Sequence, residues 1–293
     1  MIPHHHPLDE ERLRRRASFN EAASLYDGAR PDYPEALFDD MVALSGIPAG
    51  GAVLEIGSGT GKATLPLARR GFSLLGIELG EQMAAIARER LAAYPQARIE
   101  VGAFEEQILP DESFDLAVSA SAWHWIDPAI GYRKVAQALR PSGFLALLWS
   151  HQRRGNQDAS PVDAGADVNR DDKDDAFDQA LREVSRQVAP ELARAREGRS
   201  AQSSWRFARD GVLQANEWFQ APEVRRYTWE MTYDTEGYLR LLDSYSSYRI
   251  LEPGVHERLF AALAALIETR FGGSVTRQWE AELFLAQRQA ARF

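Results

Sequence analysis

The chain has 293 residues, of which 45% are hydrophobic, 26% charged and 10% aromatic. This length and balance are typical of one elaborated globular domain or two small ones, and they exclude collagen-like, coiled-coil and wholly disordered chains. The 34 Lys and Arg residues against 43 Asp and Glu residues give a formal net charge of -9. Such a surface disfavours nucleic acid as a partner. Because cysteine is absent, disulfides, thiolate nucleophiles and thiolate metal sites are excluded.

The N-terminal region is polar. Residues 1–18 contain histidines and an arginine run, and we expect a polar arm there rather than an apolar signal segment. No stretch approaches the roughly 20 apolar residues that a membrane-spanning helix needs. We therefore expect a cytoplasmic protein with no membrane partner.

From residue 52 onward, short apolar runs alternate with helical patterns, which is typical of βαβ units and a mostly parallel sheet. Helices are predicted before residue 70, over residues 81–93 and over residues 128–139. The strands predicted in this region are residues 52–56, 73–78, 99–101, 114–119 and 144–149.

The composition changes after residue 150. Residues 151–175 are rich in Asp, Asn, Gly and Ala, and we expect an acidic flexible insert. Its acidic run at residues 171–175 lacks the glycine and terminal Glu of a calcium loop, so no metal site is predicted. Residues 176–293 are expected to supply helical cap elements and two last strands, near residues 224–229 and 279–285, that complete the same sheet.

A glycine-rich turn after the first predicted strand is the most informative motif. Gly57, Gly59 and Gly61 occupy every second position, so the backbone can approach a ligand closely and offer amides to an anionic group. The spacing G-x-G-x-G differs from the G-x-G-x-x-G of dinucleotide sites. Glu55, two positions before the first glycine, would repel a diphosphate but attract an ammonium or sulfonium. The turn thus favours a zwitterionic or cationic ligand.

A second acidic residue, Glu78, ends the second predicted strand. In open α/β sheets a carboxylate at this point accepts hydrogen bonds from the hydroxyls of a ribose. We predict that role for Glu78.

At these residues the sequence resembles the class I S-adenosylmethionine-dependent methyltransferases, and within them the small-molecule group typified by quinone-biosynthesis and trans-aconitate methyltransferases. The resemblance covers residues 19–149 well and the C-terminal third loosely. It is carried by residues 54–61, Glu78, and residues 109–116, 123–127 and 139–144.

The resemblance implies an α/β, Rossmann-like, doubly wound sheet of seven strands, mostly parallel with an antiparallel last strand. It adds an N-terminal lid segment and C-terminal helical cap insertions. Residues 19–150 would form the cofactor-binding core, and the implied cofactor is S-adenosyl-L-methionine, with S-adenosyl-L-homocysteine as product.

The resemblance also implies the cofactor contacts. Glu55 would face the methionine amino group, and Glu78 would hold the ribose. The remaining predicted contacts are Gly57, Ser58, Gly59 and Gly61 at the methionine moiety, Leu79, Phe104 and Glu105 at the adenine, and Ser119 and Ala120 near the methionine end. Ala103 departs from the family, since many relatives have an acid there, so the adenine amino group would be bound by Glu105, Glu106 or backbone.

The lid segment, residues 19–34, resembles one that folds over the cofactor in this group. Tyr26, Arg30 and Tyr33 are its candidate cofactor contacts, because an aromatic face attracts a sulfonium and closure excludes water. Packing between helix and sheet is the alternative role for these residues.

Methyl transfer is an in-line displacement that mainly needs alignment, desolvation and, for some acceptors, proton removal. His124 follows the fourth predicted strand and is a candidate base for a hydroxyl or phenol; packing or substrate orientation is its alternative. Trp123, Trp125 and Tyr245 are candidate substrate contacts.

The sequence thus predicts methyl transfer to an O or N atom of a small-molecule acceptor by a monomer or homodimer. An NAD(P)-type oxidoreductase, a nucleic-acid methyltransferase and a cofactor-binding module without turnover are the alternatives. The first is disfavoured by the glycine spacing and by Glu55. The second is disfavoured by Ser119-Ala120-Ser121-Ala122 where amino-directed enzymes have an Asn/Asp-Pro-Pro-aromatic stretch.

Overall fold

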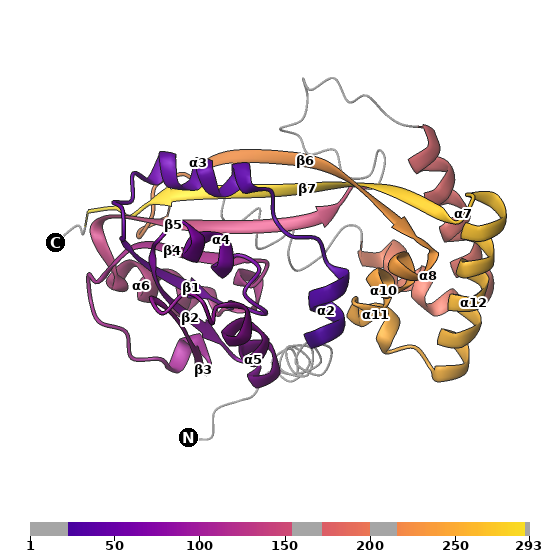
Figure 1. Ribbon diagram of the computed structural model, residues 1–293, viewed down its shortest axis with the longest axis horizontal. Coiled ribbons are helices and arrows are strands. Elements are labelled where there is room, and N and C mark those ends of the chain that lie inside the picture. Colours follow the sequence, from indigo (N-terminus) through magenta and orange to yellow (C-terminus); the bar gives the residue numbers. More distant parts are fainter. Residues whose placement is uncertain (1–22, 154–171, 200–215, 291–293) are drawn as a thin grey trace.

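A computed structural model describes residues 23–153, 172–199 and 216–290. The expected polar arm, residues 1–18, and most of the expected insert, residues 151–175, lie outside the described residues. The described parts form an α/β core joined to a helical cap (Figure 1).

One seven-stranded sheet runs through the described parts in the order β3-β2-β1-β4-β5-β7-β6. Neighbouring strands from β3 to β5 are parallel, whereas β7 is antiparallel to both β5 and β6. The predicted mostly parallel sheet with an antiparallel last strand is therefore confirmed. The strands are β1 (Ala52–Ile56), β2 (Ser73–Glu78), β3 (Ala97–Val101), β4 (Phe114–Ala120), β5 (Leu139–Gln152), β6 (Glu223–Asp234) and β7 (Ser274–Gln287).

Helices cover both faces of the sheet. On one face α3 (Glu35–Ser45), α4 (Thr64–Arg69) and α5 (Glu81–Arg90) enclose an apolar cluster that contains Phe38, Leu67 and Val118. On the other, α6 (Pro128–Ala138) and the short η1 (Phe104–Glu106) and η2 (Trp123–Trp125) enclose a second cluster. Burial of both faces explains why β1, β2 and β4 are continuous apolar runs.

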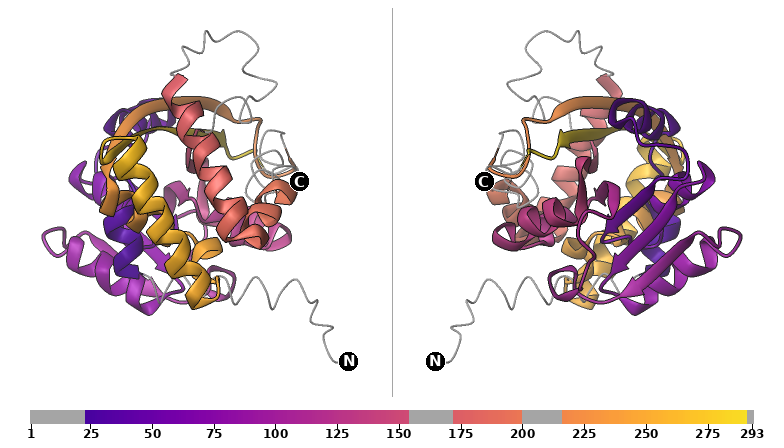
Figure 2. Two further views of the ribbon diagram at one scale, coloured as in Figure 1. Left: turned by 90° about the vertical axis from the view of Figure 1, so that its right-hand side faces the viewer. Right: turned by 90° about the vertical axis from the view of Figure 1, so that its left-hand side faces the viewer.

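The strands β5, β6 and β7 continue past the core into the cap (Figure 1). There a third apolar cluster joins the ends of β6 and β7 to five helices, and Figure 2 shows α7, α8 and α12 gathered beside these strand ends. The cap helices are α7 (Asp172–Val188), α8 (Pro190–Arg199), α10 (Thr235–Asp243), α11 (Ser246–Arg249) and α12 (Pro253–Arg270). Helix α2 (Ala23–Ala29) lies between core and cap and packs against both α5 and α10.

The ends of the expected insert belong to regular elements. Strand β5 reaches Gln152 because it pairs with β7, where Gln152 is opposite Trp279. Helix α7 begins at Asp172. Residues 140–143, which lie between the helix predicted over residues 128–139 and the strand predicted over residues 144–149, are part of β5, next to a register shift against β4.

Within the described ranges, no helix combines the length and the apolar character that crossing a bilayer requires.

Candidate active site

The glycine-rich turn lies at the carboxyl ends of β1 and β2. Gly57, Gly59 and Gly61 have φ values of 71°, 56° and 84°, a left-handed conformation that glycine adopts without strain. At Gly57 a Cβ atom would stand 2.4 Å from the Cβ of Ala122. The Gly57 amide donates to the Ile77 carbonyl at 2.8 Å, which ties the turn to β2. The glycines are therefore needed for both conformation and space.

Glu78 is brought directly against this turn. One oxygen of its carboxylate accepts from the Gly59 amide, and the other accepts from the Gly80 amide, each at 2.8 Å. These bonds fix the carboxylate at the end of β2. A carboxylate oxygen can accept more than one hydrogen bond, so the position of Glu78 suits a ligand hydroxyl.

Glu55 is fully buried, and neither of its carboxylate oxygens has a hydrogen-bond partner. Burial raises the pKa of Glu55 to about 8; the Thr64 hydroxyl, close by but outside hydrogen-bonding geometry, offsets part of this rise, and the charge of Glu78 adds to it. The hydroxyls of Ser58, Thr60 and Thr64 are also buried without partners. Buried polar groups are rarely left unbonded in native proteins, so this cluster is suited to a polar ligand.

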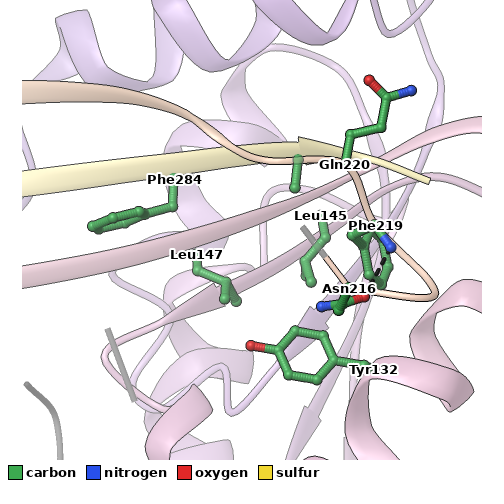
Figure 3. Close-up of a pocket in the computed structure, with 8 residues that line it drawn as sticks. Tyr132, Leu145, Leu147, Asn216, Phe219, Gln220 and Phe284 are labelled. Carbon is green, nitrogen blue, oxygen red and sulfur yellow. Dashed lines mark hydrogen bonds between the residues drawn. The ribbon is translucent and has the colours of Figure 1, made fainter. Parts of the chain in front are cut away.

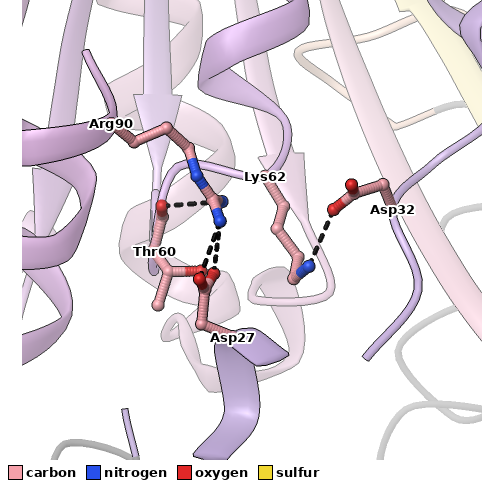
Figure 4. Close-up of polar contacts among 5 residues, drawn as sticks. All are labelled: Asp27, Asp32, Thr60, Lys62 and Arg90. Atoms are coloured by element: carbon pink, nitrogen blue, oxygen red, sulfur yellow. Dashed lines mark hydrogen bonds and ion pairs between the residues drawn. The ribbon is translucent and has the colours of Figure 1, made fainter. Parts of the chain in front are cut away.

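The lid segment is fastened to the turn by two ion pairs (Figure 4). Arg90 contacts both carboxylate oxygens of Asp27 at 2.7 and 2.8 Å and also donates to the Thr60 carbonyl at 3.0 Å. Lys62 contacts Asp32 at 2.7 Å. Sequence patterns do not indicate these pairs, since charged residues far apart in the chain meet only in the folded molecule.

Two of the three predicted lid residues make described contacts, one with the end of β4 and the other with the cap. The Tyr33 hydroxyl hydrogen-bonds the Ser121 hydroxyl at 2.9 Å, just beyond β4. The Arg30 guanidinium bonds Ser244 at 2.8 Å and lies 3.7 Å from the centre of the Tyr245 ring. Tyr26 lies on α2, but its side chain is outside the described part of the molecule. The lid segment thus connects the carboxyl end of β4 with the cap.

The predicted residues around the end of β4 differ in exposure. Ser119 is buried, and its hydroxyl donates to the Ile56 carbonyl at 2.9 Å. Ala120 ends the strand, half-buried. Trp123 is buried and packs edge-on against Tyr132 in the core.

Two neighbours in η2 are less enclosed than Trp123. His124 and Trp125 are half-buried, with ring centroids 4.7 Å apart. The structure therefore leaves these two rings, rather than Trp123, in a position to meet a ligand.

On the adenine side of the predicted site, Leu79 is 38% exposed. The Phe104 ring is buried in the core, 5.3 Å from the Lys134 ammonium. Glu105 accepts from the Asp127 amide at 3.4 Å, and its carbonyl accepts from Lys134. Of these predicted adenine contacts, Leu79 is thus exposed, whereas the Phe104 ring is buried in the core.

A pocket on the α6 face of the sheet contains none of the predicted site residues (Figure 3). The Asn216 side chain accepts from the amides of Trp218 and Phe219, both at 2.9 Å, which shapes one wall. Its lining is mostly apolar: Tyr132, Leu145, Leu147, Asn216, Phe219, Gln220, Phe284 and Ala286. It offers no catalytic group.

Comparisons with known proteins agree with this geometry. Residues 54–147 match the family described as a methyltransferase domain. An uncharacterized methyltransferase of Mycobacterium tuberculosis is 38% identical over 133 residues, which are 45% of this chain and 52% of that protein. A demethylmenaquinone methyltransferase of Tropheryma whipplei is 30% identical over 149 residues, 47% of this chain and 60% of that protein. The chain spans about half the length of the curated relatives it matches.

A solved structure from Anaeromyxobacter dehalogenans, assigned as a type II methyltransferase, shares the fold with a TM-score of 0.59 and 21% identity. The likeness covers 89% of this chain and 98% of that one. The sheet order and the glycine-rich turn agree with the match of residues 54–147 to a methyltransferase domain.

Proposed function

We propose that this protein transfers a methyl group from S-adenosylmethionine to an O or N atom of a small-molecule acceptor. The observation that supports this most directly is the buried Glu55 carboxylate without a partner, beside a glycine-rich turn. An ionised carboxylate in such a place is costly unless a cation meets it. The ammonium of a methionine moiety supplies that cation.

The residues of the turn fit the rest of this cofactor. The unpartnered hydroxyls of Ser58, Thr60 and Thr64 would donate to the methionine carboxylate or to water that bridges to it. Glu78 would accept from the ribose hydroxyls, and the exposed Leu79 would lie against the adenine, with Glu105 bonding its amino group. When bound, S-adenosylmethionine supplies a methyl group on a sulfonium, and S-adenosylhomocysteine remains.

The lid segment would align the acceptor and exclude water. Tyr33 and Arg30 span from the end of β4 to the cap, so they bound the space in which a methyl acceptor would stand. Exclusion of water and alignment of the nucleophile are the main demands of an in-line displacement. Tyr26, on the same segment, would face the cofactor.

The acceptor itself would lie between η2 and the cap. Half-buried Trp125 and the Tyr245 ring beneath Arg30 would contact it. His124 would take a proton from an acceptor hydroxyl or phenol. The demethylmenaquinone methyltransferase among the relatives supports an acceptor of the quinone-biosynthesis kind, although a carboxylate acceptor, as in trans-aconitate methyltransferases, needs no base.

Titration of S-adenosylhomocysteine and S-adenosylmethionine by calorimetry tests the proposal. Micromolar binding that is lost in Glu78→Ala and retained in Glu89→Ala is the expected result, since Glu89 is an exposed acid on the outer face of α5. NAD in place of these ligands should give no heat.

Binding of NAD instead would favour an oxidoreductase. Binding of the methyl donor without turnover on any quinol, phenol, amine or carboxylic acid in a screen would favour a binding module.

A further inference from the structure

Three buried polar groups without hydrogen-bond partners lie together where the sheet meets the cap. They are the indole nitrogen of Trp279, the amide nitrogen of Gln152 and the hydroxyl of Tyr233. Their residues are 1%, 8% and 9% exposed, respectively. None of these groups belongs to the glycine-rich turn, and none takes part in the contacts described for the candidate active site.

Strand register puts these groups on one face. Gln152 of β5 is opposite Trp279 of β7, and Trp279 is opposite Trp229 of β6. The two tryptophan rings are stacked, with centroids 6.3 Å apart. Tyr233 follows Trp229 by four residues on β6 and so lies on the same face.

The surroundings of these groups are cationic and aromatic. Burial raises the pKa of the Tyr233 hydroxyl to about 12; the Trp279 indole, close by but outside hydrogen-bonding geometry, and the charges of Arg30 and Arg277 offset part of this rise, whereas Tyr245 adds to it. Arg277 is paired with Asp178 at 2.7 Å, whereas Arg30, on the lid segment, lies over the Tyr245 ring. Indole and amide nitrogens donate only, and a phenol can donate as well.

The distance of these groups from the proposed methyl-transfer site also suits the binding of one acceptor across both. Leu148 of β5 is opposite Ala120 at the end of β4, and Gln152 is four residues further along β5, or about 13 Å at the usual strand rise. Arg30 and Tyr33 of the lid segment span the same interval. A group bound here would belong to the far end of an acceptor whose other end reaches the end of β4.

We propose that Trp279, Gln152 and Tyr233 bind the carboxylate of an aromatic or similarly apolar acceptor. The inference rests on the proposed function and specifies its substrate class. Donors on one face of β5, β7 and β6, with the charge of Arg30 near Tyr233, would satisfy the lone pairs of a carboxylate, and the rings of Trp229 and Tyr245 would supply apolar walls. A carboxylate is preferred to a neutral carbonyl because bonds from donors to a charged acceptor are the stronger ones.

The test uses the protein saturated with S-adenosylhomocysteine and four probes: benzoate, trans-cinnamate, and their neutral counterparts benzamide and cinnamyl alcohol. Binding is followed by tryptophan fluorescence, since Trp229 and Trp279 would line the site. We expect the carboxylates to bind and the neutral probes to bind at least about tenfold more weakly. Prior saturation with S-adenosylhomocysteine separates a failure of this inference from a failure of the proposed function.

Two variants and one matched control decide the role of the donors. Tyr233→Phe and Gln152→Leu should each weaken carboxylate binding about tenfold and leave S-adenosylhomocysteine binding unchanged. Neither should lower the melting temperature, because each removes a buried group that has no partner. Tyr227→Phe is the control: this β6 hydroxyl donates to Asp40 at 2.6 Å, so its removal should lower stability and leave carboxylate binding intact.

Two results would overturn the inference. One is a wild-type protein that binds S-adenosylhomocysteine but no carboxylate of the panel. The other is a Tyr233→Phe variant that loses stability as Tyr227→Phe does and keeps its carboxylate affinity, because the hydroxyl would then serve the fold through bound water.

Discussion

Arg90 joins Asp27 of the lid segment to the carbonyl of Thr60 in the glycine-rich turn. The side chains of Arg90 and Asp27 are each 22% exposed, so the pair is shielded from solvent more than the Lys62–Asp32 pair, in which Asp32 is 76% exposed. One guanidinium thereby holds the position of the lid and the shape of the turn together.

Loss of this pair should weaken cofactor binding. Asp27→Asn removes the charge that orients Arg90, and we expect affinity for S-adenosylhomocysteine to fall several-fold, or by about 1 kcal/mol. Calorimetry measures the change. Asp39→Asn is the control because Asp39 pairs with Arg70 on the outer surface, away from the turn. Equal losses in the two variants would contradict a specific role for Asp27.

Gly57 should tolerate no side chain. Gly57→Ala places a Cβ against Ala122 in addition to the strain of a positive φ, so we expect a loss of about 3 kcal/mol in stability and no S-adenosylhomocysteine binding. Gly71→Ala measures the cost of the backbone strain alone, since Gly71 has a φ of 85° and no atom within 4 Å of its Cβ position. It should cost about 1 kcal/mol and leave binding unchanged. Thermal unfolding with and without ligand separates the two.

His124 has the position of a proton acceptor, in a half-buried turn after β4. If the acceptor presents a hydroxyl or phenol, His124→Gln should lower kcat about 100-fold or more while S-adenosylhomocysteine binding stays the same. His256→Gln is the comparison, because His256 stacks on Phe260 in the cap and bonds Asp243, remote from η2. An unchanged kcat in His124→Gln would leave orientation or packing as its role.

The sequence was a good guide to the core strands and to the turn, because both depend on neighbouring residues. The apolar runs of β1, β2 and β4 are buried on both faces. Gly57, Gly59 and Gly61 have positive φ values, a conformation that is set by the local path of the chain. The approach of Glu78 to this turn followed from the general geometry of parallel sheets.

Other features could not be predicted in this way. Strand β6 runs to Asp234, beyond the expected residue 229, because its alternate residues face solvent and the apolar pattern there is weak. Phe104 was expected at the adenine, but its ring is buried beside Lys134, and a single apolar residue gives no sign of which way it will face. Contacts such as Arg90 with Asp27 depend on how the lid docks, which pairwise sequence patterns do not encode.

The ionisation of Glu55 leads to a prediction on pH. A carboxyl whose folded pKa is about 8 binds a proton in the folded protein over a range in which the unfolded chain has lost it. The stability that this group contributes is therefore fully present below its ordinary pKa and is lost as pH rises toward 8. Glu55→Gln keeps the neutral shape, so the variant should lack this decline and be the more stable protein near pH 8 without ligand.

Folding stability favours the protonated form of Glu55, whereas cofactor binding should favour the ionised form. An ammonium beside Glu55 favours the ionised carboxylate, so binding of S-adenosylhomocysteine should release a proton near pH 7, which calorimetry in buffers of different ionisation enthalpy detects. Glu55→Gln should lose both this proton release and about tenfold or more in affinity, since a neutral amide replaces a charge-assisted contact. A variant that binds as tightly as the wild type, with the same proton count, would show that Glu55 does not face the cofactor.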